Sequence, residues 1–502
     1  MDMILAGQIA HNARRFPDKT AVAEAGGKRM TYAGLHRASD RFARHLRANK
    51  VAKGDCVALL SHSCLDWVVA YIGIVKTGAI AVPINVKLTT EEIVRALRSI
   101  DCPFMVAAPE FLSVGDLRGA VGGVFPLDPP VVAAEDDIPL DVVMSPEDIE
   151  VILFTGGTTG VSKGVPLSYR NIFWNNVQLI VDTRMHEGDN TILATPLYHA
   201  GALNCWLLPH LYLGATATIL HPYSPGAFLR AIHEERVTNG WAPPSMTRDL
   251  YTHPERHTFD LSSFQRWYAA GGPLSRRDRE EIHALIPGVR IFYQYGLTEA
   301  GVIVTSLKEY DYERAPDSIG RAFLNCEVKI LRQDLSDADV GEIGEIAVKG
   351  PAVMRGYYRA PSEGVEVFHD GWLRTGDLGS IDEGGFVYLR DRLKDMIKTG
   401  GLNVYSQEVE SVLLRHPAVR DVAVIGVPDD KWGEAVTAVV VAGDGADVTE
   451  EALIRFAKDN LATYKAPKEV IFLSLDQLPI NYSGKILKRE LRARLLALRS
   501  AN

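Results

Sequence analysis

Cysteine is scarce in this sequence, and its cysteines follow no pattern. The five of them, Cys56, Cys64, Cys102, Cys205 and Cys326, are odd in number and far apart. Disulfide scaffolds and zinc sites instead use even sets or short fixed spacings. The sequence therefore excludes a disulfide-stabilised scaffold and predicts reduced thiols in a cytoplasmic protein.

Long apolar runs and an excess of positive charge are also missing. The N-terminal stretch has no basic start followed by a long apolar segment, so it is not a secretory signal. The most membrane-like stretch, residues 67–84, contains Lys76 and Pro83, which are poor choices in a lipid-spanning helix. The formal net charge of −9 argues against a general nucleic-acid binder, which needs a basic surface. We therefore expect no nucleic acid and no integral membrane contact, and a homodimer stays open.

Alternating helical and apolar segments predict an α/β fold. A chain of 502 residues is too long for one ordinary core. Residues 20–150 and 214–295 each alternate helical patterns with apolar strands, which predicts two doubly wound sheets. Residues 318–390 have short strands with frequent glycines, which favours a small β-barrel or sandwich. Residues 396–502 mix strands and helices and predict a compact α+β domain.

The strongest local signal is the stretch LFTGGTTGVSKG at residues 153–164. An apolar strand end is followed by glycines, whose missing β-carbons let successive N–H groups point toward one anion. Threonine hydroxyls and the ammonium group of Lys163 would add contacts to a polyphosphate. The stretch is not a Walker loop, because Val161 and Ser162 separate Gly160 from Lys163, and this disfavours an ordinary P-loop NTPase. Taken alone, it could also be a mobile surface loop.

Further motifs follow in order along nearly the whole chain. They are TPLYHAGAL at 195–203, YGLTE at 295–299, GWLRTGDLG at 371–379, RDRLKDMIKTGG at 390–401 and LPINYSGKILKREL at 478–491. Together with the glycine-rich loop they resemble the adenylate-forming superfamily, which includes acyl-CoA synthetases, aryl-CoA ligases, luciferases and the adenylation domains of peptide synthetases. The loop departs from the family pattern at Gly156, where many members carry Ser or Thr, and at Ser162, which is often Pro.

This resemblance implies a carboxylic acid:CoA ligase that uses ATP, Mg²⁺ and coenzyme A. The carboxylate attacks the α-phosphorus of ATP, pyrophosphate leaves, and a thiol then displaces AMP from the acyl-AMP. The resemblance also implies an N-terminal domain at 1–391, with its β-barrel part at about 318–390, a hinge at 392–395 and a mobile C-terminal lid domain at 396–502. Lys394 matches the hinge residue about which the lid turns.

The matched motifs also predict the nucleotide site. In YGLTE, a flat aromatic suits an adenine face, a hydroxyl suits a phosphate oxygen and a carboxylate suits Mg²⁺. By resemblance, Tyr295 packs on adenine, Thr298 meets the α-phosphate, Glu299 ligates magnesium, Asp377 accepts the ribose hydroxyls and Lys485 acts in adenylation. The other predicted ATP and AMP contacts are Thr155, Gly156, Gly157, Thr158, Thr159, Gly160, Lys163, Gly271, Gly272, Pro273, Gly296 and the ribose-binding Arg392.

Each of these motifs also has an ordinary structural interpretation. YGLTE could be a loop before a helix, Asp377 could cap local N–H groups, and residues 390–410 could be a solvated linker. Lys485 could be a helix N-terminal lysine without function, although the positive end of the helix dipole makes that slightly unfavourable. The agreement of several motifs in the family's order favours the functional interpretation.

The acid is predicted to lie against a mainly apolar wall. Alone among aliphatic residues, His199 would be a core histidine, but by resemblance it gates the acyl pocket. No general base is required, because a carboxylate is already ionised near pH 7. Since the wall has no Lys or Arg to pair with a second carboxylate, we expect an aryl, alicyclic or aliphatic monocarboxylate. The predicted wall residues are His199, Gly201, Trp241, Ala270, Gln294, Gly301 and Val302.

Contacts to CoA are predicted near the hinge, on the lid and at one N-terminal lysine. Gly400 and Gly401 match the loop that faces the pantetheine tunnel, and Lys87 matches a basic residue near the CoA nucleotide in chlorobenzoate-type ligases. A solvated surface role for Lys87 and a packing role for Trp432 stay open. The predicted CoA contacts are Lys87, Gly400, Gly401, Trp432, Tyr464 and Lys468.

Two other functions are compatible with parts of the sequence. One is a stand-alone adenylation enzyme that loads a carrier protein, so that the second substrate is a protein surface. The other is a non-catalytic nucleotide-binding or regulatory protein on the same fold. The joint presence of the predicted catalytic and nucleotide-binding residues argues against this second alternative; these are Lys163, Glu299, Asp377, Arg392 and Lys485.

Overall fold

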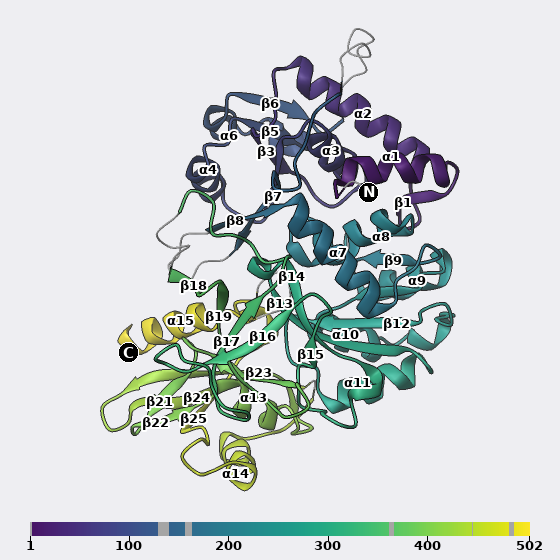
Figure 1. Ribbon diagram of the computed structural model, residues 1–502. Coiled ribbons are helices and arrows are strands. Elements are labelled where there is room, and N and C mark those ends of the chain that lie inside the picture. The colour runs from purple at the N-terminus through teal and green to yellow at the C-terminus, as the bar shows by residue number, and fades with distance from the viewer. Residues whose placement is uncertain are drawn as a thin grey trace.

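The computed structural model describes residues 3–128, 140–155, 163–360, 366–443, 445–480 and 486–501. Figure 1 shows a sheet of the N-terminal segment at the top, a large central sheet, and a smaller unit at the lower left that carries the C-terminus. The prediction of an α/β fold with a large N-terminal domain and a smaller C-terminal domain is confirmed.

The first sheet has six strands, of which the first five in sheet order run parallel and the last is antiparallel. Its central strands are fully buried, as expected of a parallel sheet with both faces covered. In sheet order the strands are β6 (Gly123–Pro126), β5 (Phe104–Ala107), β3 (Cys56–Leu60), β4 (Ile80–Pro83), β7 (Ile149–Thr155) and β8 (Lys163–Ser168).

The second sheet has nine strands and forms the centre of the molecule. One sequence expectation is wrong: the strand that begins at Thr20 belongs here, where Val22 pairs with Ala217, and not to the first sheet. The alternating pattern could not reveal this, because it predicts strands but not their partners. In sheet order the strands are β15 (Arg321–Ala322), β14 (Val302–Leu307), β13 (Arg290–Leu297), β12 (Arg266–Ala270), β11 (Asn239–Trp241), β9 (Asn190–Leu193), β10 (Thr216–Ile219), β1 (Thr20–Glu24) and β2 (Arg29–Thr31).

A small antiparallel sheet of five strands follows the central sheet. Its last strand ends at Arg392, and the first strand of the next sheet begins at Ile397. The proposed hinge at 392–395 therefore falls in the connection between two sheets. The strands are β16 (Glu327–Leu331), β17 (Gly344–Lys349), β18 (Phe368–His369), β19 (Trp372–Ile381) and β20 (Val387–Arg392).

The C-terminal sheet also has five strands. One face packs against α13 and α14 through residues such as Leu413 and Leu453, and the other packs against α15 through Leu491 and Leu495. The strands are β21 (Ile397–Thr399), β22 (Leu402–Val404), β23 (Val419–Asp429), β24 (Gly433–Ala442) and β25 (Glu469–Phe472). This mixture confirms the predicted α+β unit.

Helices connect most of the strands. The helices are α1 (Leu5–Arg15), α2 (Tyr32–Ala48), α3 (Leu65–Lys76), α4 (Thr90–Ser99), α5 (Pro109–Leu112), α6 (Gly115–Ala120), α7 (Tyr169–Thr183), α8 (Leu208–Leu213), α9 (Pro225–Glu235), α10 (Pro244–Thr252), α11 (Arg276–Leu285), α13 (Ser406–Leu413), α14 (Glu450–Asn460) and α15 (Lys488–Ala501). A π-helix, η2 (Gly201–Leu207), precedes α8. Short 3₁₀ helices are η3 (Arg256–Thr258), η4 (Thr298–Ala300), η5 (Glu309–Asp311) and η6 (Leu475–Gln477).

The glycine-rich stretch is followed by a strand that the sequence analysis did not predict. Thr155 at the end of β7 pairs with Lys163 at the start of β8, so the two strands form a hairpin. Helix α7 begins only after β8, where Ser168 accepts a hydrogen bond from the N–H of Asn171 and completes a capping box. The strand β8 therefore separates the glycine-rich stretch from α7.

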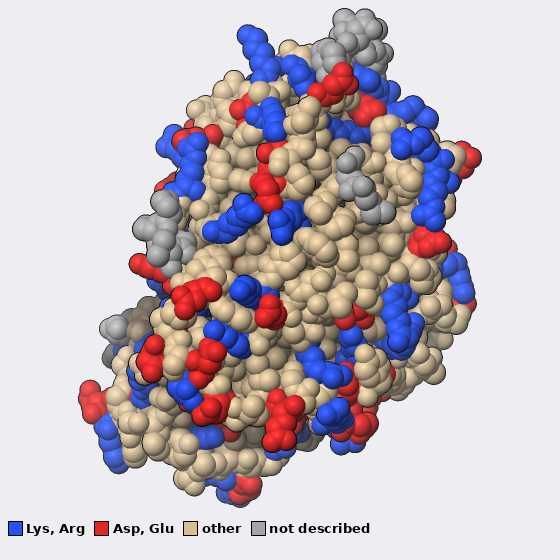
Figure 2. All heavy atoms as spheres, in the orientation of Figure 1, with Lys and Arg blue, Asp and Glu red and all other residues tan. Residues whose placement is uncertain are grey.

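The surface of the protein agrees with its composition. Lys and Arg are interspersed with Asp and Glu around the face that Figure 2 shows, and no continuous positive stripe crosses that face. Within the described part of the chain, no helix is both long and apolar enough to cross a bilayer. All five cysteines are free, as predicted.

A buried carboxyl group lies at the start of β7. Glu150 is completely buried, and the hydroxyl of Tyr71 on α3 donates a 2.9 Å hydrogen bond to its Oε1. Burial raises the pKa of Glu150 from 4.5 to about 8. The folded protein therefore keeps a proton on Glu150 at pH values where the unfolded chain has released it.

We predict that stability falls as the pH rises from about 4.5 to 8, because the folded state binds the Glu150 proton more tightly than the unfolded state. The slope from one such group is at most about 1.4 kcal/mol per pH unit. Glu150→Gln keeps the shape of the side chain but does not titrate. The Tm of the variant minus that of the wild type should therefore increase as the pH rises from about 4.5 to 8. A constant Tm difference between pH 5 and 8 would contradict the assignment.

Candidate active site

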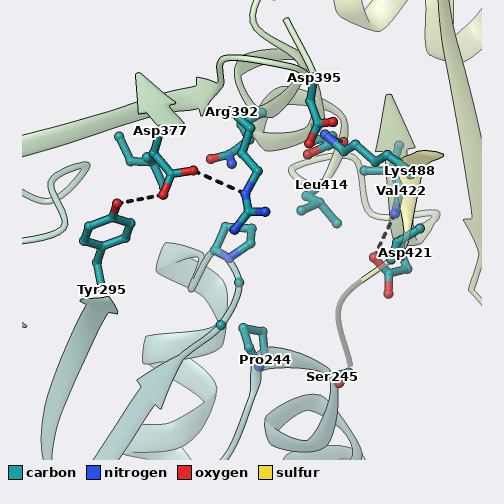
Figure 3. A pocket seen from close by; sticks show the side chains of 18 of the residues that line it. Pro244, Ser245, Tyr295, Asp377, Arg392, Asp395, Leu414, Asp421, Val422 and Lys488 are labelled. Atoms are coloured by element: carbon teal, nitrogen blue, oxygen red, sulfur yellow. Dashed lines mark hydrogen bonds and ion pairs between the residues drawn. The ribbon is translucent and has the colours of Figure 1, made fainter. Parts of the chain in front are cut away.

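A cavity of about 200 Å³ lies between the central sheet, the small sheet and the C-terminal unit. Figure 3 shows Tyr295, Asp377 and Arg392 on one side and Lys488, Asp421 and Val422 on the other. Part of its wall is the carboxyl end of β13, at residues 293–296. Ligands of open sheets bind beyond the carboxyl ends of the strands. The other lining residues include Pro244, Ser245, Gly271, Gly272, Pro273, Gln294, Gly296, Asp395, Glu410 and Ile486.

The carboxylate of Asp377 is the polar centre of this cavity. The hydroxyl of Tyr295 donates a 2.7 Å hydrogen bond to Asp377 Oδ2, and Arg392 Nε lies 3.2 Å from Oδ1 (Figure 3). Asp377 and Arg392 are register partners on β19 and β20, so backbone pairing holds them side by side. An aromatic ring, a carboxylate and a guanidinium group are thus grouped as a nucleoside site requires.

The turn after Tyr295 depends on the glycine that follows it. The strand bulges between Tyr295 and Gly296, and a β-carbon on Gly296 would lie 1.7 Å from the carbonyl oxygen of Val302. Only glycine permits this close return of β14 along β13. The turn sets Thr298 and Glu299 on the short helix η4, just beyond the cavity residues.

Glu299 and Lys163 approach one another through a residue that the sequence analysis missed. The hydroxyl of Tyr357 donates a 3.1 Å hydrogen bond to Glu299 Oε1, and Lys163 Nζ lies 4.9 Å above the Tyr357 ring. Tyr357 follows Gly356 in an irregular segment without a recognisable motif, so no local pattern marks it as a site residue.

The residues present are compatible with magnesium bound together with a nucleotide. Among the described residues, no group of three or more His, Cys, Asp or Glu side chains could hold an ion alone. Mg²⁺ typically uses one or two carboxylates and completes its shell with substrate phosphates and water. Glu299, a partly exposed residue, would offer one such hard oxygen ligand.

Several predicted phosphate contacts lie outside the described residues. These are Gly156, Gly157, Thr158, Thr159, Gly160 and Lys485. Thr155 and Lys163 precede and follow residues 156–162, and they pair with each other at the loop end of the hairpin. Ile486, which directly follows Lys485, lines the cavity.

Gly201 and Trp241, two of the residues predicted for the acyl wall, lie against each other. A β-carbon on Gly201 would lie 3.5 Å from the Trp241 ring, so the absence of a side chain leaves the indole its space. Burial, and then the charge of Lys87, lower the pKa of His199 well below its usual value. A pKa lowered in this way makes the imidazole a weak base, which agrees with a pocket wall rather than with general base catalysis.

The rest of the predicted wall comes from β12, β13 and the start of β14. Ala270 and Gln294 are register partners on adjacent strands. Gly301 has φ +84°, and a β-carbon there would lie 2.6 Å from the carbonyl oxygen of Ala352, so glycine is required. Val302 begins β14 and is buried.

The predicted CoA contacts on the C-terminal unit form a separate cluster. Gly400, in the tight turn between β21 and β22, donates its N–H to the carbonyl of Trp432 at 2.8 Å. Lys431 and Lys468 lie 4.8 and 5.2 Å from the Trp432 ring, which is 37% exposed. Gly401, at φ +79°, faces open space, and Tyr464 is exposed. Of these described residues, none lines the cavity at Asp377.

Lys87 lines a second cavity of about 350 Å³ on the N-terminal side. Tyr198, adjacent to His199, and Met246 also line it, and Ser245 borders both cavities. None of the residues predicted for the acyl wall lines this second cavity, so Ser245 is its link to the cavity at Asp377.

An ionic network that the sequence analysis did not predict crosses the hinge region. Lys488 Nζ lies 2.6 Å from Glu410 Oε1 and donates to the hydroxyl of Ser406 at 2.6 Å. Ser406 donates in turn to Asp391 Oδ1 at 2.9 Å. The spacing of Asp391, Ser406, Glu410 and Lys488 along the chain gives no sign that they meet.

The pattern that defines AMP-binding enzymes matches residues 9–358, and that of the AMP-binding enzyme C-terminal domain matches residues 408–485. A feruloyl-CoA synthase from an Amycolatopsis species is 37% identical over 487 residues, which cover 96% of this chain and 97% of that protein. The fatty acid:acyl-carrier-protein ligase ScoC of Streptomyces coeruleorubidus is 32% identical over 93% of this chain and 92% of that protein.

A solved structure shows the same fold with reaction components bound. The o-succinylbenzoate CoA synthetase of Bacillus subtilis, in complex with its acyl-adenylate intermediate, superposes with a TM-score of 0.86 and 31% identity over 97% of both chains. The same enzyme in complex with ATP and a magnesium ion also gives a TM-score of 0.86, at 31% identity over 97% of this chain and 99% of that one. The predicted resemblance is thus confirmed, and the chain belongs to the adenylate-forming family of AMP-binding enzymes.

Proposed function

We propose that this enzyme is an ATP-dependent carboxylic acid:CoA ligase that forms acyl-AMP and pyrophosphate, and then acyl-CoA and AMP. The observation that carries the proposal is the cavity in which Tyr295, Asp377 and Arg392 meet the segment that directly follows Lys485. A nucleoside bound at Asp377 would direct its phosphates toward η4 and the hairpin of β7 and β8. CoA ligation by a relative that aligns over nearly its whole length supports this activity.

In the first step, the enzyme positions two anions and neutralises their charge. The acid carboxylate is already ionised, and the neutral imidazole of His199 removes no proton from it. Lys163, Thr298 and Lys485 are proposed to hold the phosphate oxygens while the carboxylate attacks the α-phosphorus. Magnesium held by Glu299 would neutralise charge on the phosphates. Placement and electrostatics therefore supply most of the catalysis.

The second step requires another face of the C-terminal unit. In this structure α13, β23 and α15 face the cavity, whereas Gly400 and Trp432 lie outside it. A turn of residues 396–502 about Lys394 would withdraw Lys485 and bring Gly400, Gly401 and Trp432 toward the acyl-AMP. Such domain closure lets one cavity serve two reactions in sequence.

CoA is favoured over a carrier protein by the cluster around Trp432. An exposed indole between Lys431 and Lys468 offers a stacking face for a nucleotide base and two cations for its phosphates. Lys87 adds a third cation at the mouth of the second cavity. The relative that acts on an acyl-carrier protein keeps the alternative in view. Equal turnover with pantetheine and with CoA would favour the carrier-protein alternative.

A homodimer and a cytoplasmic location stay predictions.

The acid is proposed to be a monocarboxylate with an aryl, alicyclic or aliphatic body. Within the described part of the predicted wall, no residue is charged, and an unpaired second carboxylate would be costly to bury. Trp241 limits the depth, because its ring packs against Gly201 and is largely buried.

Lys485→Ala is expected to reduce acyl-AMP formation by orders of magnitude while thioester formation from supplied acyl-AMP stays nearly intact. The reason is that Lys485 is proposed to face the phosphates only during adenylation. Acid-dependent ATP–pyrophosphate exchange and acyl-AMP thiolysis measure the two steps separately. Lys458→Ala, an exposed lysine on α14, is the control and should change neither. Equal damage to both steps in the Lys485 variant would refute the two-conformation assignment.

Gly401→Phe should block thioester formation and spare adenylation, since a side chain would enter the proposed thiol tunnel. Gly401 has φ +79°, so the substitution also strains the turn. Gly288→Phe is a matched control, because that glycine has φ +82°, equally open surroundings and no proposed role. Normal CoA turnover by the Gly401 variant would rule out the tunnel assignment.

Trp241→Ala should shift the acid preference toward longer or bulkier acids, and Trp241→Phe should give a smaller shift in the same direction. Removal of the indole opens space beside Gly201. A pyrophosphate-release screen over aliphatic and aromatic acids measures the preference. An unchanged size ranking in both variants, or best activity of the wild type on a dicarboxylate, would contradict this pocket.

A further inference from the structure

Gln294 is a buried amide without partners. It lies in β13 between Ala270 on β12 and Ser306 on β14, and its side chain is 1% exposed. Neither Nε2 nor Oε1 has a hydrogen-bond partner among the described residues. Buried polar groups in native proteins are nearly always paired with protein, water or ligand, so this carboxamide needs an explanation.

Other unpartnered polar groups lie on neighbouring elements. Ser306 is the register partner of Gln294, which places both side chains on the same face of the sheet, yet its buried Oγ also has no partner in the described chain. Asn204 lies on the π-helix η2, which packs against β14, and neither Nδ2 nor Oδ1 of its amide has a hydrogen-bond partner among the described residues. On the neighbouring β11, the indole N–H of Trp241 is unpaired as well. Hydrogen-bonding capacity is therefore concentrated in an otherwise apolar region.

The face on which Gln294 lies is the one that borders the acyl wall. Side chains two residues apart in a strand share a face, so Gln294 and Phe292 lie on the same face of the sheet. The ring of Phe292 packs on Tyr268 at 5.3 Å, and Tyr268 stacks on Trp206 of η2 at 4.3 Å. Gln294 also lines the cavity beside Gly271 and Tyr295. The small partner Ala270 leaves room over the sheet next to the carboxamide.

We propose that the acid which this enzyme activates carries a hydroxyl group that the carboxamide of Gln294 binds. The inference rests on the proposed ligase function and adds the chemical class of its substrate. The amide both donates and accepts, so it matches a hydroxyl, which does the same. A charged group is disfavoured, because the wall offers no counter-charge within the described residues. A site built for a hydrogen bond rejects the analogue that lacks it, because its own polar atoms then stay unpaired.

The test compares acids that differ only by hydroxyl and methyl. Suitable pairs are para-hydroxybenzoate and para-methylbenzoate, the corresponding substituted cinnamates, and an ω-hydroxy fatty acid with its methyl-terminated isostere. For at least one pair, the wild type should favour the hydroxyl member at least about tenfold in kcat/KM for pyrophosphate release. Gln294→Leu should reduce that ratio at least about tenfold, mainly through loss on the hydroxyl member.

Two controls separate recognition from folding. Gln178→Leu changes another buried glutamine, whose amide already donates to the carbonyl of Ile303 at 3.0 Å, and should leave the hydroxyl-to-methyl ratio unchanged. Gln294→Leu should keep or raise the Tm without ligand, because it removes an unpaired buried amide. A wild-type ratio near one, or a ratio that Gln294→Leu does not change, would overturn the inference while the ligase function stands. Failure to release pyrophosphate with any acid would overturn the ligase function itself.

Discussion

The carboxylate of Asp377 joins parts of the chain that are far apart in sequence. It accepts a hydrogen bond from Tyr295 at the end of the central sheet and pairs with Arg392 at the end of the small sheet. The connection to the C-terminal unit begins directly after Arg392. One buried anion with two partners therefore joins the ends of two sheets at the cavity, where the connection to the C-terminal unit begins. If a ribose took the place of these partners, the contact between Asp377 and Arg392 would change, and Arg392 directly precedes the connection to the C-terminal unit.

One face of the C-terminal unit lies toward the cavity in this structure, and the second half-reaction is proposed to use another. The face of α13, β23 and α15 is held toward the cavity by the chain of contacts from Lys488 through Ser406 to Asp391. The face with Gly400 and Trp432 points elsewhere. Since Asp391 precedes the hinge and Ser406 follows it, a turn of the lid must either carry or break this contact. Under the proposed two-step mechanism, the network would link the position of the C-terminal unit to the first half-reaction.

Much of this arrangement could be predicted from the sequence, because local patterns determine it. The strands β3, β5 and β12 and the helix α2 lie within the two regions, 20–150 and 214–295, whose alternating patterns predicted them. The pairing of β1 with β10 and the strand β8 were missed, because sheet partners and a short hairpin arm leave no periodic signal. Tyr357, Ser406 and Lys488 were missed for a similar reason, since their contacts join residues more than fifty positions apart. The unpaired amide of Gln294 was visible only once its neighbours were known.

The central claim is that ATP is cleaved between its α- and β-phosphates because a carboxylate attacks the α-phosphorus. Phosphorus NMR of one reaction containing enzyme, magnesium, ATP, CoA and an accepted acid measures this directly. The account predicts AMP and pyrophosphate in equal amounts, formed only when the acid is present. Acid-dependent formation of ADP and inorganic phosphate would contradict it.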